Sequence, residues 1–441
     1  MNRIIPLAAA ATLLSGALPC TPLGVALAAQ QVPDSMTVEQ AVQRVLATHP
    51  AMQEAQNGVA ASAARVQMRQ SVFTPAVVAD GSYSRIGPTP TLNFGGEPFQ
   101  LFPADNWDAS VGIHHTIEDW GRRKTAVEQA QSFETTATSN VDYVRSRLAY
   151  QTIGAFYAVL FLRQNLGVQD EEIAALGQHL EIIQGKVEAG TATNFDALTT
   201  QVRIATAKSQ RVDIANALEQ RRIELRDLLG MPADTAVQPV GDFSVDSTDL
   251  NVDSLRTVAL ARRPDLKLAR DAEASAEVGT RLAALANKPA LNLVLSVGAK
   301  NGYVPDINQI KADFVAGMSV QLPVWQGDRT SSQVRAAEAD VTTARSRTTT
   351  LERSITTAVE QAVAAVRAAR EKIATTDIQV EQATQALALA RTRYQAGVVT
   401  NLDVLDAETV LSEARLVQLR AHYDLVRTRY QLRQATGEKV W

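Results

Sequence analysis

The second half of the chain repeats the first half. At an offset of 207 residues, Ala189-Gly190 matches Ala396-Gly397, and Thr193-Asn194 matches Thr400-Asn401. About a dozen identities fall within about forty positions of this region, whereas chance would give roughly two or three. The fold must therefore be built from two equivalent units.

Each unit has the same order of predicted elements: a helix, two strands, a very long helix, a sharp turn and a final helix. Upstream of the strands the offset becomes 214, as between Pro50 and Pro264, because the first unit has the longer loop between its strands. We assign residues 1–29 to a signal peptide, 30–230 to the first repeat, 231–251 to a linker and 252–441 to the second repeat.

The N-terminal segment has the features of a cleavable secretory signal. Arg3 precedes an apolar run, and small residues occupy positions 26, 28 and 29, so the mature chain is expected to leave the cytoplasm. Cys20 is the only cysteine and lies in this segment after Pro19, which disfavours acylation and leaves no disulfide in the mature chain. After this segment the chain has no run of about 18 uncharged apolar residues, so we do not expect a second membrane helix.

Two stretches without proline, 122–187 and 329–394, predict helices of roughly 65 residues, or about 100 Å at about 1.5 Å per residue. In the second stretch, apolar residues recur every three or four positions with alanine between them, which indicates close coiled-coil packing. This stripe consists of Leu351, Ile355, Val359, Ala362, Val366, Ile373 and Leu387. Helices alone also fit a soluble coiled coil or a solenoid.

The predicted strands alternate apolar and polar residues. In the segment 107–117, Trp107 and Val111 lie on one face, and Asp108 and Ser110 lie on the other. Two hairpins with about ten to twelve residues per strand suit a tilted transmembrane barrel whose apolar side chains face lipid. We expect strands at about 76–87, 106–118, 290–300 and 312–323, with exposed loops at 87–105 and 301–311.

Four strands cannot close a barrel around a pore, because open sheet edges leave unpaired backbone groups in lipid. The chain must therefore share its barrel with other copies. Three copies would supply about twelve strands, which is enough for a water-filled lumen, and the same symmetry would assemble the helices into a tube. The predicted fold is an α+β membrane protein with two internal repeats, in which a trimeric 12-stranded β-barrel continues into a long α-helical tunnel.

Several segments resemble the TolC-like outer-membrane efflux proteins, which are the outer-membrane factors of tripartite export systems. The resemblance covers essentially the whole mature chain and is most specific at Tyr394–Glu408, Lys186–Leu198, Trp120–Arg123 and Trp325–Arg329. It implies a homotrimer in the outer membrane of a Gram-negative cell, with a helical extension in the periplasm. It also implies that the helical end docks onto a periplasmic adaptor (membrane fusion) protein served by an inner-membrane pump.

The resemblance implies roles for the two turns after the long helices, here called the first tip (188–196) and the second tip (395–403). It places a gate at Asp403 and Asp406, with Tyr394 nearby. The two acids are three residues apart on one helical face, so threefold symmetry would form two negative rings that favour cations. Plain helix capping is the alternative. Adaptor docking is expected at Ala189, Gly190, Thr191, Thr193, Asn194, Asp196, Ala396, Gly397, Val398, Thr400 and Asn401.

Local chemistry agrees with sharp turns at both tips. Gly190 and Gly397 can adopt the left-handed conformation that ends a helix, and the Thr-Asn pairs after them suit capping of the next helix. Asp196 is the first-repeat counterpart of Asp403, but Thr199 replaces the second acid. We therefore expect Asp196 to have a structural role.

The tips differ from the best-known family member, in which polar residues link neighbouring hairpins in the closed state. Phe195 and Val399 occupy the equivalent positions here, so Tyr394 loses its ionic partner. Closure is therefore expected to depend on apolar packing and on the acidic rings.

Other functions have little support in the sequence. The 43 Lys+Arg residues are balanced by 47 Asp+Glu residues, whereas nucleic-acid binders usually have a basic excess on one face. His114 and His115 lie on opposite strand faces and cannot chelate one metal, and no phosphate loop or nucleophile motif predicts an enzyme or a cofactor. The main prediction is a passive exit duct. The alternatives are an exit duct for type I protein secretion and a periplasmic coiled-coil scaffold without a channel.

Overall fold

A computed structural model describes residues 35–92, 95, 99–235, 237–244 and 250–441. Within the chain, Ser35–Trp441 form one compact unit. The predicted signal peptide at 1–29, with Cys20, lies outside the described residues. Among the described helices, none contains a stretch that is both long and apolar enough to cross a membrane.

The helices confirm the two-repeat architecture, because each α-helix of the first repeat has a counterpart of equal length in the second. Helices α3 and α7 each run for 67 residues, as the absence of proline predicted. Pro50 and Pro264 occupy the first position of α2 and α6, where a missing amide hydrogen is tolerated. The pairs are α1 (Val38–Thr48) with α5 (Val252–Arg262), α2 (Pro50–Gln70) with α6 (Pro264–Ala284), α3 (Arg122–Glu188) with α7 (Arg329–Gln395), and α4 (Asn194–Leu228) with α8 (Asn401–Ala435).

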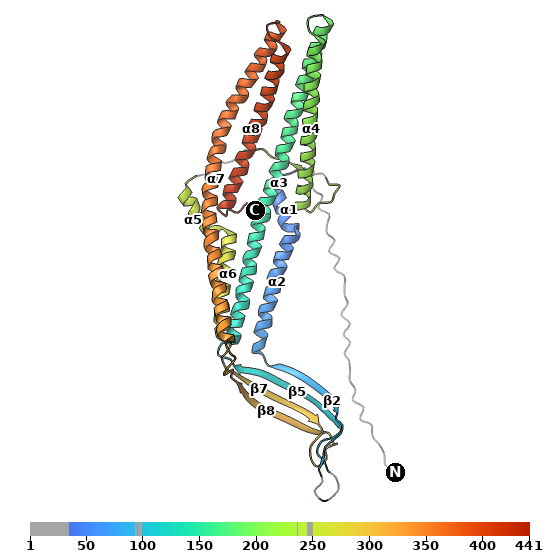
Figure 1. The fold of residues 1–441 in the computed structure, drawn as a ribbon, viewed down its shortest axis with the longest axis vertical. Coiled ribbons are helices and arrows are strands. Elements are labelled where there is room, and N and C mark those ends of the chain that lie inside the picture. The colour runs from blue at the N-terminus through green and yellow to red at the C-terminus, as the bar shows by residue number, and fades with distance from the viewer. Residues whose placement is uncertain (1–34, 93–94, 96–98, 236, 245–249) are drawn as a thin grey trace, which may run out of the picture. The chain divides into compact units, whose positions relative to one another are not determined.

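Each long helix runs from the sheet to a tip, where the chain turns into the next helix (Figure 1). Helix α3 packs against α1, α2, α4, α6 and α8, and α7 packs against α5, α6 and α8. The unit thus contains two helical hairpins, α3–α4 and α7–α8, that meet mainly where α3 contacts α8. The short elements are the 3-10 helix η1 (Ser71–Phe73), the parallel pair β1 (Ser35–Met36) and β6 (Gln238–Pro239), and the antiparallel pair β3 (Thr91–Leu92) and β4 (Phe99–Gln100).

The main sheet has four antiparallel strands in the order β2-β5-β7-β8. Their bounds are β2 (Ala76–Arg85), β5 (Asp105–Glu118), β7 (Ala290–Lys300) and β8 (Lys311–Gln321). In the register, Val111 pairs with Val297 and Val297 pairs with Phe314, so apolar residues of successive strands share one face. Strand β8 ends before Leu322, which was expected inside it, because Pro323 cannot donate a ladder hydrogen bond.

One face of this sheet exposes large apolar side chains. Soluble proteins rarely expose so much contiguous apolar surface, and such surfaces usually contact a membrane or a partner. The exposed residues include Val77, Trp107, Val111, Val297, Phe314, Met318 and Val320. The alternation that predicted a lipid-facing sheet is thus present in the fold.

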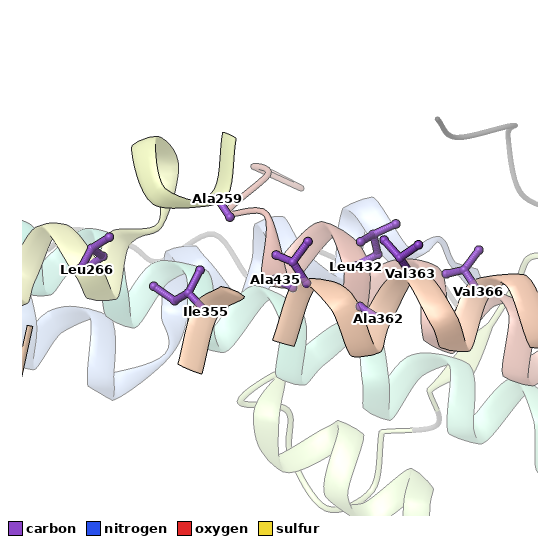
Figure 2. Packing of buried hydrophobic residues seen from close by; sticks show 9 residues of the cluster. Ala259, Leu266, Ile355, Ala362, Val363, Val366, Leu432 and Ala435 are labelled. Atoms are coloured by element: carbon purple, nitrogen blue, oxygen red, sulfur yellow. The ribbon is translucent and has the colours of Figure 1, made fainter. Parts of the chain in front are cut away.

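A buried cluster joins the four helices of the second repeat (Figure 2). Ile355, Val359, Ala362 and Val366 of α7 form its centre, in agreement with the predicted stripe. The other members are Ala259 of α5, Leu266 of α6, and Val363, Leu432 and Ala435. This cluster holds α8 against α7 below the second tip.

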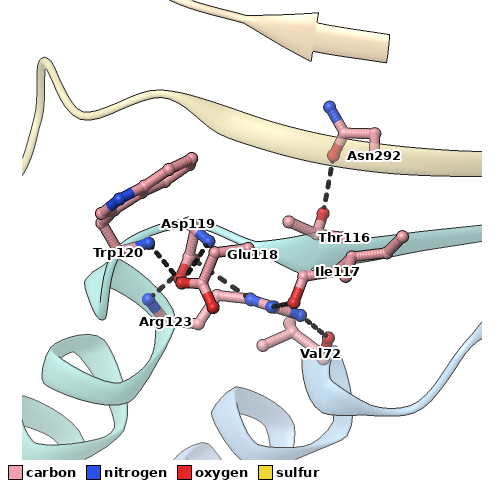
Figure 3. Close-up of polar contacts among 8 residues, drawn as sticks. All are labelled: Val72, Thr116, Ile117, Glu118, Asp119, Trp120, Arg123 and Asn292. Carbon is pink, nitrogen blue, oxygen red and sulfur yellow. Dashed lines mark hydrogen bonds and ion pairs between the residues drawn. The ribbon is translucent and has the colours of Figure 1, made fainter. Parts of the chain in front are cut away.

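Figure 3 shows the corner at which β5 becomes α3. The guanidinium of Arg123 donates to Asp119 Oδ2 at 3.1 Å, to the Val72 carbonyl at 3.2 Å and to the Ile117 carbonyl at 3.4 Å. Trp120 has a φ of 53°, a left-handed conformation that is strained for a bulky residue. Arg123 therefore ties the ends of β5 and η1 together and fixes the direction in which α3 leaves the sheet.

Candidate gate at the helical tips

Both tips are built in the same way. Gly190 and Gly397 have φ values of 73° and 72°, as predicted for residues that end a helix. The caps of the following helices are Thr193 and Thr400, each in a reciprocal capping box with an aspartate three residues later. Asn194 and Asn401, which were also expected to cap, are instead the first helical residues. The threonine hydroxyl already accepts the amide hydrogen that a cap must satisfy.

Asp403 has the same local role as Asp196. Asp403 Oδ2 accepts hydrogen bonds from the Thr400 amide at 2.7 Å and from the Thr400 hydroxyl at 2.6 Å. Asp196 Oδ2 accepts the corresponding pair from Thr193 at 3.0 Å and 2.6 Å. The Thr400 hydroxyl lowers the pKa of Asp403 below its ordinary value, so this exposed carboxylate stays ionised at neutral pH. Helix capping and a negative charge at the tip are therefore both properties of Asp403.

Asp406 contacts the other hairpin. Its Oδ1 lies 3.4 Å from Nη2 of Arg203 on α4. No repeated motif marked Arg203 in advance, because its counterpart in the second repeat is Val410. The two acids that were predicted to form rings thus differ, since Asp403 binds its own turn and Asp406 forms an ion pair between hairpins.

Asn401 connects three helices. Its Nδ2 donates to the Asp196 carbonyl at 3.2 Å and to the Thr200 hydroxyl at 3.4 Å, both on α4. Its Oδ1 lies 2.8 Å from Nε2 of His179 on α3, so His179 must donate from Nε2, because Oδ1 can only accept. Asn401 is 4% exposed, whereas its counterpart Asn194 is exposed. We call Asn401, His179 and Thr200 the buried clasp.

Tyr394 is buried rather than open to solvent. Its ring makes an edge contact with His179, with ring centroids 5.5 Å apart. The Lys186 ammonium lies 4.0 Å from the ring centroid and donates to the Tyr394 carbonyl at 3.0 Å. Burial raises the pKa of Tyr394 above its ordinary value. The predicted loss of the ionic partner at position 399 stands, since Val399 carries no charge. Lys186 on α3 instead places a positive charge against the ring within the chain.

Polar contacts therefore link the two hairpins within one chain, in addition to apolar packing. We predicted closure from apolar packing and acidic rings alone, and for the contacts inside one chain that prediction was wrong. The apolar part is also present: Val399 packs at the margin of a cluster that contains Ile183, Leu387 and Val404. Phe195, by contrast, is exposed.

The residues predicted for docking are mostly accessible. Among the predicted set, Asn401 is buried and Asp196 is half-buried. The exposed members are Ala189, Gly190, Thr191, Thr193, Asn194, Ala396, Gly397, Val398 and Thr400. Phe195, Leu198 and Leu402 add exposed apolar surface to the same tips.

A buried carboxylate lies beside the clasp. Glu408 on α8 is buried and accepts a hydrogen bond from Nε of Arg391 on α7 at 3.1 Å. Arg391, His179 and Tyr394 also line a groove between α3 and α7. Within the described part of the chain, no group of three or more His, Cys, Asp or Glu residues is arranged to hold a metal ion.

The clasp gives the tip a pH dependence. Burial lowers the pKa of His179, and Arg391 and Lys186 lower it further, whereas Asn401 and Glu408 act in the opposite direction. The packed tip thus binds fewer protons than a separated tip, so its stabilisation is complete above the ordinary histidine pKa of about 6.5 and weakens as the pH falls below it.

We therefore expect the two hairpins to separate more often at the tip as the pH falls from about 7.5 to about 5. The matched control is His179→Gln, which keeps a donor for Asn401 but cannot titrate. The measurement is the distance between fluorescent labels on the two tips over this pH range, and an equal change in His179→Gln would exclude His179 as the titrating group.

Comparison with known proteins identifies the family. The model of the family described as outer membrane efflux protein matches residues 41–231 and 255–438. The outer membrane efflux protein BepC of Brucella suis is 24% identical over 98% of this chain and 90% of that protein. Outer membrane protein TolC of Vibrio cholerae is 25% identical over 74% of this chain and 76% of that protein.

Solved structures have the same fold. The outer membrane protein VceC of Vibrio cholerae superposes with a TM-score of 0.77 at 18% identity and covers 92% of this chain and 97% of that chain. The CmeC outer membrane channel of Campylobacter jejuni gives a TM-score of 0.80 at 15% identity, over 91% and 85% of the two chains. The chain therefore belongs to the outer membrane efflux protein family and acts as an exit duct in the outer membrane.

Proposed function

We propose that three copies of the chain form one duct, which conducts small molecules delivered by an inner-membrane pump through a periplasmic adaptor. The observation that carries this proposal is the four-stranded sheet. Its outer strands β2 and β8 each pair on one side only among the described residues. The face of the sheet that carries Val111, Val297 and Phe314 is apolar and exposed. In lipid, such edges must pair with other strands. Three sheets joined from β8 to β2 would close a barrel of about twelve strands.

The pairing geometry supports this closure. Strands β2 and β8 have similar lengths, 10 and 11 residues. They run in opposite directions, because the three pairings between them are all antiparallel. A β8 strand of one copy can therefore pair antiparallel with β2 of the next copy, which continues the antiparallel pattern within the chain. The same symmetry brings the three pairs of tips together around one axis.

Cysteine cross-linking tests the trimer directly, because the only native cysteine is Cys20. Ser82→Cys on β2 would be combined in turn with cysteines at each of positions 315–319 on β8. We expect oxidation to give a covalent trimer for at least one pair. The control is Ser82→Cys with Asp108→Cys, which face each other in the register within one chain and should give no oligomer. Monomers at every β8 position would contradict the shared barrel.

The tips are proposed to carry the gate and the adaptor contact. The exposed residues at the turns provide accessible apolar and polar surface, and the ionised Asp403 carboxylates would form a negative ring near the symmetry axis. In a narrow pore, such a ring favours cations. The adaptor would contact the outer parts of the tips, around Gly190 and Gly397.

Replacing Asp403 and Asp406 together with alanine is expected to weaken cation selectivity and to raise conductance, because the ring loses charge and side-chain volume. The measurement is the reversal potential and the single-channel current in a KCl gradient. Asp196→Ala removes an equivalent capping carboxylate from the first repeat and serves as the control for loss of a cap. Unchanged selectivity in the double variant would contradict the gate role of both acids.

Names of relatives support small molecules as the substrate class. The chain is 23% identical to a protein named for pyoverdine export in Pseudomonas putida and 22% identical to one named for fusaric acid resistance in Burkholderia cepacia. A second candidate, protein secretion, is favoured by 24% identity to the alkaline protease secretion protein AprF of Pseudomonas aeruginosa. Gene deletion separates them: drug sensitivity without loss of a secreted protein supports small-molecule efflux.

A further inference from the structure

An ion pair joins the second helices of the two hairpins. Arg203 Nη2 on α4 lies 3.4 Å from Asp406 Oδ1 on α8, and the two side chains are 41% and 59% exposed. Helices α4 and α8 otherwise touch little, since each packs mainly against the long helix of its own hairpin. The pair therefore lies at the seam between hairpins, within one turn of the predicted ring at Asp403.

The pair has no counterpart elsewhere in the repeat. The residue equivalent to Arg203 is Val410, and the residue equivalent to Asp406 is Thr199. Each charge of the pair is therefore absent from the other repeat, although helices α4 and α8 have equal lengths. Neither the repeat symmetry nor helix formation requires either charge. The property of the tip that the pair changes is therefore its local charge.

The two acids of the tip consequently contribute different net charges. Among the described residues, no lysine or arginine forms an ion pair with Asp403, whose carboxylate is held by Thr400 alone. Asp406 is accompanied by the positive charge of Arg203. With three copies, the level of Asp403 would carry three negative charges, whereas the level of Asp406 would be close to neutral.

We propose that Arg203 sets the ion selectivity of the duct by neutralising Asp406, so that one acidic ring, at Asp403, acts as the selective constriction. This inference rests on the proposed function, in which the first two turns of α8 line the lumen of a trimer. Arginine keeps its charge at every accessible pH, so the neutralisation does not change with conditions. Salt weakens exposed ion pairs, and the effect of Arg203 is therefore greatest at low ionic strength.

The test compares four variants in a planar bilayer with a KCl gradient at low salt. Arg203→Gln should raise the ratio of cation to anion permeability about threefold, the scale of a weak exposed charge interaction, because three unpaired carboxylates are added to the lumen. Asp406→Asn should lower the ratio, because Arg203 is left unpaired. The combined variant should return to the wild-type ratio. Arg203→Lys keeps the charge and should also resemble the wild type.

Arg211→Gln is the matched control. Arg211 lies on the same helix and pairs with Asp170 of α3 at 2.5 Å, with similar exposure, so its loss should leave selectivity unchanged. If Asp406→Asn alters selectivity but Arg203→Gln does not, the role of Arg203 is overturned while the acidic gate stands. If neither alters selectivity while the channel conducts, Asp406 does not face the lumen and the inference fails with that part of the proposed function.

Discussion

Replacing Asn401 with leucine is expected to separate the two hairpins at the tip and to increase the resting conductance. The substitution leaves Nε2 of the buried His179 ring without its partner, whereas the Thr200 hydroxyl keeps its hydrogen bond to the Asp196 carbonyl. Unpaired buried polar groups cost about 1–3 kcal/mol. A loss of about 2 kcal/mol would raise the ratio of separated to packed tips about thirtyfold.

The measurement is the open fraction of single channels at neutral pH. Asn194→Leu is the control, because Asn194 has the same position in the first repeat but is exposed, and it should behave as the wild type. Equal open fractions for the two leucine variants would show that the clasp does not hold the tip.

Replacing Gly437 with alanine is expected to destabilise the helical unit strongly. Gly437 has a φ of 69°, and an added Cβ would lie 2.9 Å from backbone atoms of Arg262 and Arg263. The clash is with backbone at the junction of α5 and α6, so it cannot be relieved by a rotamer change. With the left-handed conformation, the cost is about 3 kcal/mol.

Gly230→Ala provides the comparison. Gly230 ends α4 as Gly437 ends α8, with a φ of 61°, but its added Cβ would meet only the Thr48 hydroxyl at 3.8 Å. Its cost should be limited to the left-handed conformation, about 1 kcal/mol. Thermal unfolding in detergent, followed by circular dichroism, should give a much larger decrease in Tm for Gly437→Ala. Similar decreases in Tm for the two variants would mean that the backbone at the α5–α6 junction shifts to accommodate the added Cβ at little cost.

The repeat and the long helices could be predicted because their signals are local or repeated. Proline-free stretches bounded α3 and α7, and the change of offset from 214 to 207 located the loop between strands in which the repeats differ. The alternation around Trp107 and Phe314 predicted strands, since side chains on a strand alternate between faces. These features depend on residues close together in sequence.

The contacts of the tips could not be predicted in the same way. Asn194 and Asn401 have the same local motif, yet only Asn401 is buried. His179 of α3 lies against Asn401, whereas no described residue of α7 lies against Asn194 in this way. Lys186 and Arg203 showed no pattern that marked them, since their partners Tyr394 and Asp406 lie more than two hundred residues away. A single sequence does not specify which hairpin faces which.

The exit duct is tested most directly by single-channel recording from the purified protein in a planar bilayer, together with its oligomer mass in detergent. We predict a trimer that gives small cation-selective currents, with larger currents in the Asn401→Leu variant. A membrane-inserted trimer that passes no current, even as Asn401→Leu and with both Asp403 and Asp406 replaced by alanine, would contradict the exit duct.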